Sequence, residues 1–225
     1  MRKICMFAAG LSLTVFATMA RANLLDDGSF ELAIDGTQTS NSNWTLTANF
    51  PDGLTAAAMF SSSVWAASDG QTGVWFKSFE GDQDPSDDTA NVELTQTASN
   101  VASGGTYELI FQSARETNFT AGSATATLSS SSGPSVSVDL LTATYNDDGN
   151  MASDPTTFAL SLPNVVAGDD LTVSVEMVDG VDALANPQSL MVDNFVLVPE
   201  PASIVLIGLG LLGVSAIRRK RQAGE

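Results

Sequence analysis

The sequence contains no histidine and one cysteine, Cys5, so the residue types that most often carry acid–base and nucleophilic catalysis are nearly missing. It also has no G-x-S-x-G nucleophile elbow and no phosphate-binding loop. A pair of carboxylates is sufficient for glycoside hydrolysis, but 26 acidic residues form so many pairs that the pattern has little weight. We therefore predict a protein that is not an enzyme, with a glycosidase as the weaker alternative.

Basic residues are scarce outside the two ends of the chain. Of the nine Lys and Arg residues, only Lys77 and Arg115 lie within residues 23–217, which hold 25 of the 26 acidic residues. The resulting net charge of −23 repels nucleic acids and anionic membrane surfaces. It favours solubility outside the cell and the binding of cations, calcium above all. The alternative is that the acidic composition reflects an exported surface protein and marks no particular site.

The first 22 residues have the three parts of a secretory signal peptide. Residues 2–3 are basic, residues 4–16 are apolar, and residues 20–22 form an Ala-Arg-Ala cleavage site. We predict cleavage before Asn23. Because Cys5 is removed with this segment, the mature chain can form no disulfide and offers no thiol nucleophile.

The last 28 residues, Val198 to Glu225, form a second unit, in which Pro199-Glu200-Pro201 follows Val198 and precedes an uncharged apolar run over residues 202–217. As a helix this run is about 24 Å long, which is short for a hydrocarbon core of about 30 Å. The prolines are expected to keep the run apart from the preceding fold. The basic cluster that ends the unit consists of Arg218, Arg219, Lys220 and Arg221. A buried core helix would not lie between a Pro-Glu-Pro break and a basic cluster. A plain tail anchor explains the apolar run and the basic cluster but leaves the tripeptide unexplained.

The tripeptide, the short apolar run and the basic cluster, in this order, resemble the PEP-CTERM sorting signal of Gram-negative bacteria. The resemblance implies export across the inner membrane and transient retention there through residues 202–217. It also implies that an exosortase-type enzyme removes the tail. The expected location of the mature protein is therefore the cell surface or the extracellular space.

Residues 23–198 show no sustained helical period; apolar and polar residues alternate instead. Clear alternation predicts strands at residues 107–112, 135–140 and 171–177, each with one buried and one wet face. Further strands are predicted at 44–49, 59–65, 73–79, 91–97, 124–129, 157–162 and 190–198. About ten short strands separated by Asp-Gly turns predict one all-β domain, an antiparallel β-sandwich of the jelly-roll type.

Two segments of this body resemble the first and last strands of galactose-binding-like jelly rolls, a superfamily that includes many carbohydrate-binding modules. Residues 23–31 read Asn-Leu-Leu-Asp-Asp-Gly-Ser-Phe-Glu, with Asp27 in place of the usual Asn. Residues 191–197 read Met-Val-Asp-Asn-Phe-Val-Leu, and residues 73–81 fit a middle strand of the superfamily. The resemblance implies the fold but names no ligand.

In related domains a structural calcium ion joins the first strand to the last. The matching positions here are Glu31 and Asp193, with backbone carbonyls near Ser29. Calcium takes six to eight oxygen ligands, which carboxylates and carbonyls supply without His or Cys. The alternative is that both residues are solvated acids at strand ends, in which case the acidic run at residues 82–88 is the next candidate for a weak calcium site.

Of the three tryptophans, Trp65 beside the small-residue loop 66–70 is the candidate platform for stacking on a sugar ring, whereas Trp44 and Trp75 are expected in the core. The sequence as a whole predicts an exported, non-enzymatic protein of the cell surface or extracellular matrix, associated with exopolysaccharide or a biofilm matrix. A carbohydrate-binding module with a defined sugar site is the alternative. Neither function involves nucleic acid.

Overall fold

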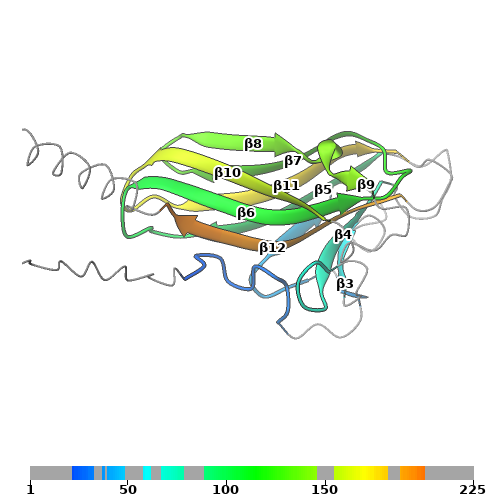
Figure 1. Cartoon of the computed structure of the whole chain (residues 1–225), viewed down its shortest axis with the longest axis horizontal. Coiled ribbons are helices and arrows are strands. Elements are labelled where there is room, and N and C mark those ends of the chain that lie inside the picture. Colours follow the sequence, from blue (N-terminus) through cyan, green and yellow to red (C-terminus); the bar gives the residue numbers. More distant parts are fainter. Residues whose placement is uncertain are drawn as a thin grey trace, which may run out of the picture.

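The computed structural model describes residues 22–32, 37–38, 40–48, 58–61, 67–78, 89–145, 155–181 and 188–200. These residues form two sheets packed face to face (Figure 1) and one short 3-10 helix, Leu140–Thr142. The strands are β1 Thr37–Gln38, β2 Thr45–Ala48, β3 Ala58–Ser61, β4 Gly73–Lys77, β5 Ala90–Ala98, β6 Gly105–Arg115, β7 Ala121–Ser130, β8 Ser135–Asp139, β9 Thr144–Tyr145, β10 Thr156–Val165, β11 Leu171–Gly180 and β12 Ser189–Pro199.

One sheet has seven strands in the order β1-β3-β4-β12-β6-β10, with β9 also paired to β6. The other has five strands in the order β2-β5-β11-β7-β8. Every pairing is antiparallel except that of β6 with β9. The predicted antiparallel sandwich is confirmed. All ten predicted strands are present, because alternation of apolar and polar residues determines which face of a strand is buried.

The opening segment, residues 23–31, is not the strand that its resemblance implied. Asp27 and Phe30 have positive φ values of 54° and 57°, so the chain turns sharply here instead of running extended. The segment nevertheless lies against the last strand, since Leu24 N donates to Leu197 O (2.9 Å) and Phe195 N donates to Gly28 O (2.8 Å). The expected neighbourhood of the two segments is therefore correct and the expected secondary structure is wrong.

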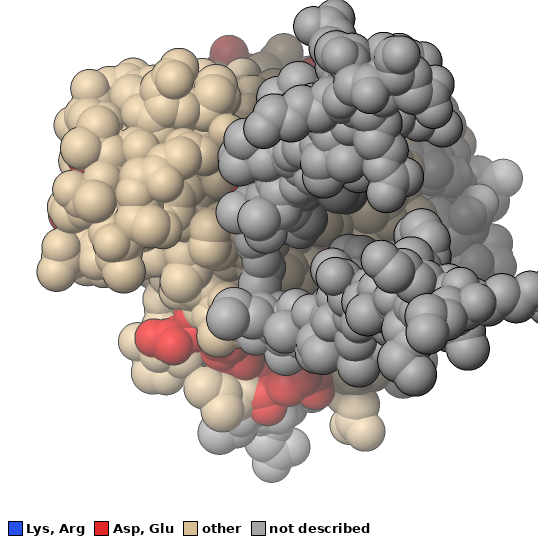
Figure 2. Space-filling view, turned by 60° about the vertical axis from the view of Figure 1, so that its left-hand side comes forward, with Lys and Arg blue, Asp and Glu red and all other residues tan. Residues whose placement is uncertain are grey.

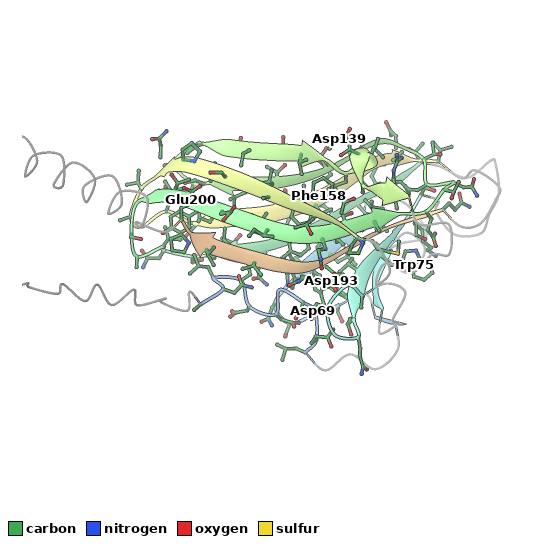
Figure 3. All side chains as sticks on the ribbon, viewed as in Figure 1. Asp69, Trp75, Asp139, Phe158, Asp193 and Glu200 are labelled. Carbon is green, nitrogen blue, oxygen red and sulfur yellow. The ribbon has the colours of Figure 1, made fainter. Side chains whose placement is uncertain are left out.

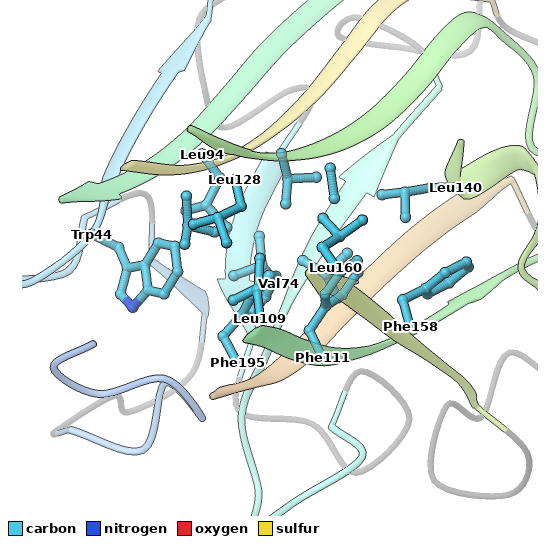
Figure 4. Close-up of a cluster of buried hydrophobic side chains, with 14 of the residues drawn as sticks. Trp44, Val74, Leu94, Leu109, Phe111, Leu128, Leu140, Phe158, Leu160 and Phe195 are labelled. Atoms are coloured by element: carbon cyan, nitrogen blue, oxygen red, sulfur yellow. The ribbon is translucent and has the colours of Figure 1, made fainter. Parts of the chain in front are cut away.

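Apolar side chains from both sheets fill the space between them (Figure 4). Phe111 of β6 lies at the centre, stacked on Phe195 with ring centroids 4.9 Å apart and on Phe158 at 5.3 Å. Phe30 and Trp44 extend this aromatic cluster towards the opening segment, 5.1 Å from each other. Burial of each such ring stabilises the fold by about 1.5–3 kcal/mol, so these contacts tie the opening segment to the sandwich.

A β-bulge in β12 changes which residues face the core. Leu190 and Val192 are buried in the main core, and the register then shifts between Asp193 and Val196, with Asn194 at a φ of 55°. After the bulge Phe195 is again part of the core. Since side chains alternate across a strand, Asp193 belongs to the outer face of the seven-stranded sheet.

The first and last described residues leave the sandwich at the same end (Figure 1). In the described ranges, no helix has the length and apolarity needed to cross a membrane. The predicted apolar segments 4–16 and 202–217, together with Pro201 and the cluster Arg218 to Arg221, lie outside the described residues.

Candidate functional site

The two predicted calcium ligands hold the same loop, residues 67–72, which we call the 67–72 loop. Asp193 Oδ2 accepts hydrogen bonds from the backbone N of Ser68 (2.7 Å), the backbone N of Asp69 (2.9 Å) and the Ser68 hydroxyl (3.1 Å). Figure 3 shows Asp193 and Asp69 near each other on the side of the sandwich where the opening segment lies. The carboxylate thus provides an acceptor for donors of the 67–72 loop, which would otherwise lie against β12 without hydrogen-bond partners.

Glu31 holds the other half of the 67–72 loop. Its Oε1 accepts hydrogen bonds from the backbone N of Gln71 (2.8 Å) and of Thr72 (2.7 Å). Gly70 lies between the two anchored halves at a φ of 69°, and a Cβ there would lie 2.4 Å from the Glu31 carboxyl carbon. The Asp-Gly turn expected from the sequence is therefore required both for its backbone conformation and for the space it leaves.

The Asp193 side chain is fully buried. Burial raises its pKa to about 7, against the four hydrogen-bond contributions from the 67–72 loop and from the backbone N of Asn194, which favour the ionised form. The carboxyl therefore changes charge near neutral pH.

The fit of these residues to calcium is limited by the donors already present. Three donors surround Asp193 Oδ2 and two surround Glu31 Oε1, and a cation would compete with them for the same lone pairs. Within the described part of the chain, no group of three or more acidic side chains is placed to hold an ion. Both anchoring oxygens thus fit hydrogen-bond donors better than calcium. Calcium at Glu31, Asp193 and the carbonyls near Ser29 stays a prediction.

A second candidate site is the outer face of the five-stranded sheet, where Ser and Thr form two rows across the strands. The first row joins Thr45, Thr95, Ser174, Thr127 and Ser137 through direct cross-strand pairing. The second row joins Thr97, Thr172, Ser129 and Ser135 in the same way, and the hydroxyls of Thr97 and Thr172 are 2.9 Å apart. We call these the hydroxyl rows. They present nine neighbouring hydroxyls, each both donor and acceptor.

An acidic row runs beside the hydroxyl rows. Glu93 pairs directly with Glu176 across β5 and β11, and Asp139 lies in the same row on β8; all three are exposed. Like charges placed opposite each other destabilise a sheet, so this row lowers the stability of the five-stranded sheet locally. Figure 2 shows acidic side chains also gathered on the face of the molecule that it presents.

Two hollows lie along β2 and β5 beside these rows. One, of about 410 Å³, is lined by residues that include Thr47, Glu93 and Glu176. The other, of about 570 Å³, is lined by residues that include Asp26, Thr95 and Thr97. Both therefore combine hydroxyl and carboxylate groups on a wet surface.

The tryptophans do not form a platform in the described part of the structure. Trp44 is buried, as expected, and its indole N donates to Asp27 O (3.0 Å). The expectation that Trp75 lies in the core is wrong, because its neighbours Val74 and Phe76 take the inward positions of β4 and leave Trp75 half-buried on the outer face. Its indole N donates to the Ser189 hydroxyl, and Lys77 Nζ lies 5.6 Å from its ring centroid. Trp65, the predicted platform, lies outside the described residues.

The start of the sorting motif belongs to the sandwich. The strand β12 runs one residue beyond the predicted boundary, to Pro199, which pairs with Tyr107 of β6. Glu200 N donates to Thr106 O (2.8 Å), and Glu200 Oε1 accepts a hydrogen bond from the Ser161 hydroxyl (2.7 Å). Pro199 can end β12 because a proline at a strand end needs no ladder donor. The apolar run 202–217, which the prolines are predicted to keep apart from the fold, lies outside the described residues.

Comparison with known proteins identifies one sequence motif and one fold. Residues 197–221 match the family model described as the PEP-CTERM protein-sorting motif. The motif indicates export and transient anchoring through the C-terminus, and implies processing by an exosortase. No curated protein sequence matches the chain.

Among solved structures, TmCBM61 in complex with β-1,4-galactotriose is similar, with 20% identity over 80% of this chain and 99% of that chain and a TM-score of 0.51. The enzymatically active domain of bacteriophage CBA120 tailspike protein 4 has 17% identity over 78% of this chain and 21% of that chain, with a TM-score of 0.47. A sugar-binding protein of Bacteroides thetaiotaomicron, so described provisionally, has 9% identity over 80% and 100%, with a TM-score of 0.46. The chain therefore carries a PEP-CTERM sorting motif behind a β-sandwich with the fold of carbohydrate-binding modules.

Proposed function

We propose that this chain is an exported, non-enzymatic protein of the cell surface or extracellular matrix that contacts polysaccharide through the outer face of its five-stranded sheet. The sorting motif supports the location. The single observation that carries the binding is the pair of hydroxyl rows, which cross four and five strands with no aromatic or basic residue among their members.

Hydroxyl rows suit a polysaccharide for two physical reasons. Neighbouring strands are about 4.7–4.9 Å apart, so a chain of sugars laid across the sheet meets a hydroxyl partner at every strand. The sheet is also rigid, so its short side chains lose little conformational entropy on binding. Without stacking aromatic rings each contact is weak, and affinity comes from many contacts along one polymer.

The acidic row narrows the class of glycan. Glu93, Glu176 and Asp139 place negative charge beside the hydroxyl rows, and like charges across an interface lower affinity. We therefore expect neutral or amino-sugar polysaccharides to bind better than polyuronates. The net negative charge of the whole body acts in the same direction.

The binding proposal predicts that removing hydroxyls from the first row weakens polysaccharide binding. The test variant combines three substitutions, Thr95→Val, Ser174→Ala and Thr127→Val. It removes three adjacent hydroxyls from the outer face and leaves the inward-facing apolar residues of these strands unchanged. We expect a loss of about tenfold or more in apparent affinity, since each hydrogen bond contributes about 0.5–1.5 kcal/mol. Affinity electrophoresis in gels containing a neutral, an amino-sugar or a uronic-acid polysaccharide measures it.

The matched control for this variant is Thr106→Val with Thr157→Val, which removes hydroxyls from the other sheet. Equal migration of the two variants in every gel would contradict binding at the hydroxyl rows. Binding that is retained by the triple variant but lost on removal of Trp65 would place the sugar site at the predicted aromatic platform instead.

The sorting proposal predicts two cleavages, one before Asn23 and one near Pro199 to Pro201. Intact-mass measurement of the protein secreted by its native host should give a chain without residues 1–22 and without Arg218 to Arg221. A mature protein that retains this basic cluster would show a permanent tail anchor and contradict the sorting proposal.

A further inference from the structure

The first two residues of the Pro-Glu-Pro tripeptide are part of the folded sandwich. Pro199 is the last residue of β12 and pairs with Tyr107. Glu200 is held at both its backbone and its side chain, through Thr106 O at 2.8 Å and the Ser161 hydroxyl at 2.7 Å. Figure 3 places Glu200 at the end of the sandwich, beside β6 and β10.

An enzyme that recognises this tripeptide would have to bind groups of Glu200 that already form hydrogen bonds within the sandwich. The Glu200 carboxylate, the one charge in Pro-Glu-Pro, accepts the Ser161 hydroxyl, and the Glu200 amide is turned towards β6. A peptidase binds its substrate as an extended segment whose backbone groups are free to pair. In the folded sandwich these groups are not free.

We propose that the sandwich masks the start of its own sorting motif, so that the tail-processing enzyme acts on chains in which the end of β12 has come away from β6. This rests on the proposed sorting function. The fold then regulates the release of the protein from the membrane: a chain with a firmly docked Glu200 is processed slowly, and a chain with a loosened one is processed fast.

The end of β12 can open without unfolding the domain. The pairing of β12 with β4 covers only Ser189 to Val192, so the far half of the strand lacks that neighbour. On that side the opening segment takes the place of β4, and Leu197 N donates to the Asn23 side chain (2.8 Å). On the other side β6 pairs with Val196 to Pro199. Beyond Leu197, the last residues are partly exposed and the Pro199 nitrogen carries no donor. Segments with few buried contacts open with low free energy, far below that of global unfolding.

The test is the rate of tail removal in the native host, followed by pulse labelling and intact mass. When opening and closing are fast, cleavage follows the population of the open form. Ser161→Ala removes the side-chain bond without changing the motif, and we expect removal about two- to fivefold faster. Ser161→Asp places a like charge beside Glu200, and we expect it to be faster still.

The matched controls are Thr157→Ala and Thr157→Asp, which make the same changes on an exposed residue of β10 that lies four positions before Ser161, near the start of the strand. They should be processed at the wild-type rate. Hydrogen exchange of the Glu200 amide in the full chain gives a second measurement, and it should be faster in both Ser161 variants than in the controls.

Three outcomes are distinguishable. Graded acceleration from wild type through Ser161→Ala to Ser161→Asp supports masking. Equal rates in all five proteins, or slower removal in the Ser161 variants, overturn it while leaving sorting intact. A wild-type chain that keeps residues 218–221 overturns the sorting function itself.

Discussion

Asp193→Ala should lower the free energy of unfolding by about 2–4 kcal/mol at pH 5, measured by urea denaturation of residues 23–200. The substitution leaves the backbone donors of Ser68, Asp69 and Asn194 without their acceptor at a fully buried position. Each buried unpaired donor costs about 1–3 kcal/mol, less where the 67–72 loop can turn its donors to water. Asp193→Asn should cost less, because its amide oxygen still accepts.

Asp69→Ala is the matched control, because it removes a carboxylate from the same loop while keeping the backbone donor. The Asp69 side chain is exposed, and we expect a change within about 0.5 kcal/mol. If Asp193→Ala is as mild as Asp69→Ala, the carboxylate of Asp193 does not anchor the loop.

The same residue predicts the direction of the pH dependence. Burial raises the pKa of Asp193 from 3.8 to about 7, so the folded state binds a proton that the unfolded state has lost. The contribution of Asp193 to stability is therefore complete below pH 4 and is lost as the pH rises towards 7, by up to about 1.4 kcal/mol per pH unit. Urea midpoints at pH 5 and pH 8 should differ less in Asp193→Asn than in the wild type. Parallel behaviour of the two proteins would contradict this assignment.

Calcium can be tested on the same proteins. An ion that binds only the folded state adds about 2.7 kcal/mol at a hundredfold excess over its Kd. Thermal melts in chelator and in millimolar calcium should then differ for the wild type and coincide for Asp193→Ala. A wild-type melt that does not respond to calcium rules out the ion and leaves the hydrogen-bonded anchor as the whole role of Glu31 and Asp193.

The strands could be predicted because burial of one face imposes a period of two on the sequence, and each long strand shows it. The turn at Asp27 and Phe30 could not be predicted, because phenylalanine rarely adopts a positive φ and the sequence gives no sign of one at Phe30. The local sequence of residues 23–31 looks extended. Its contacts with Phe195 and Leu197, about 170 positions away in the sequence, decide its conformation.

In the candidate sites, too, the residue types could be predicted from the sequence, whereas their spatial arrangement could not. Glu31 and Asp193 could be paired from a resemblance, but their shared partner, the 67–72 loop, depends on tertiary contacts. The hydroxyl rows contain residues that the sequence displays plainly at alternate positions of β5, β7 and β11. Only the register between the strands aligns Thr95 with Ser174 and Thr127, and register is set by turns and bulges that alternation does not reveal. The docking of Glu200 on Ser161 was missed for the same reason.

Gly28→Ala should destabilise the protein more than any other substitution of a described glycine by alanine. A Cβ at this position would lie 2.0 Å from Phe195 O and 2.8 Å from the Asn23 side-chain nitrogen, so the two segments cannot keep their present separation. Moving them apart breaks the hydrogen bond from Phe195 N to Gly28 O and withdraws Phe30 from the aromatic cluster. Overpacking and the lost contacts together should cost about 3–5 kcal/mol.

Gly105→Ala separates this steric effect from the conformational preference of glycine. Gly105 has a φ of 140°, which strains any other residue, but a Cβ there would meet no atom within 4 Å. We expect a cost of about 1–2 kcal/mol from backbone strain alone. Urea unfolding followed by tryptophan fluorescence compares the variants, and the signal includes Trp44, whose indole donates to Asp27 O beside the clash. If Gly28→Ala costs no more than Gly105→Ala, the opening segment does not depend on its close approach to β12. The Asn23 contacts that hold the end of that strand would then be dispensable as well.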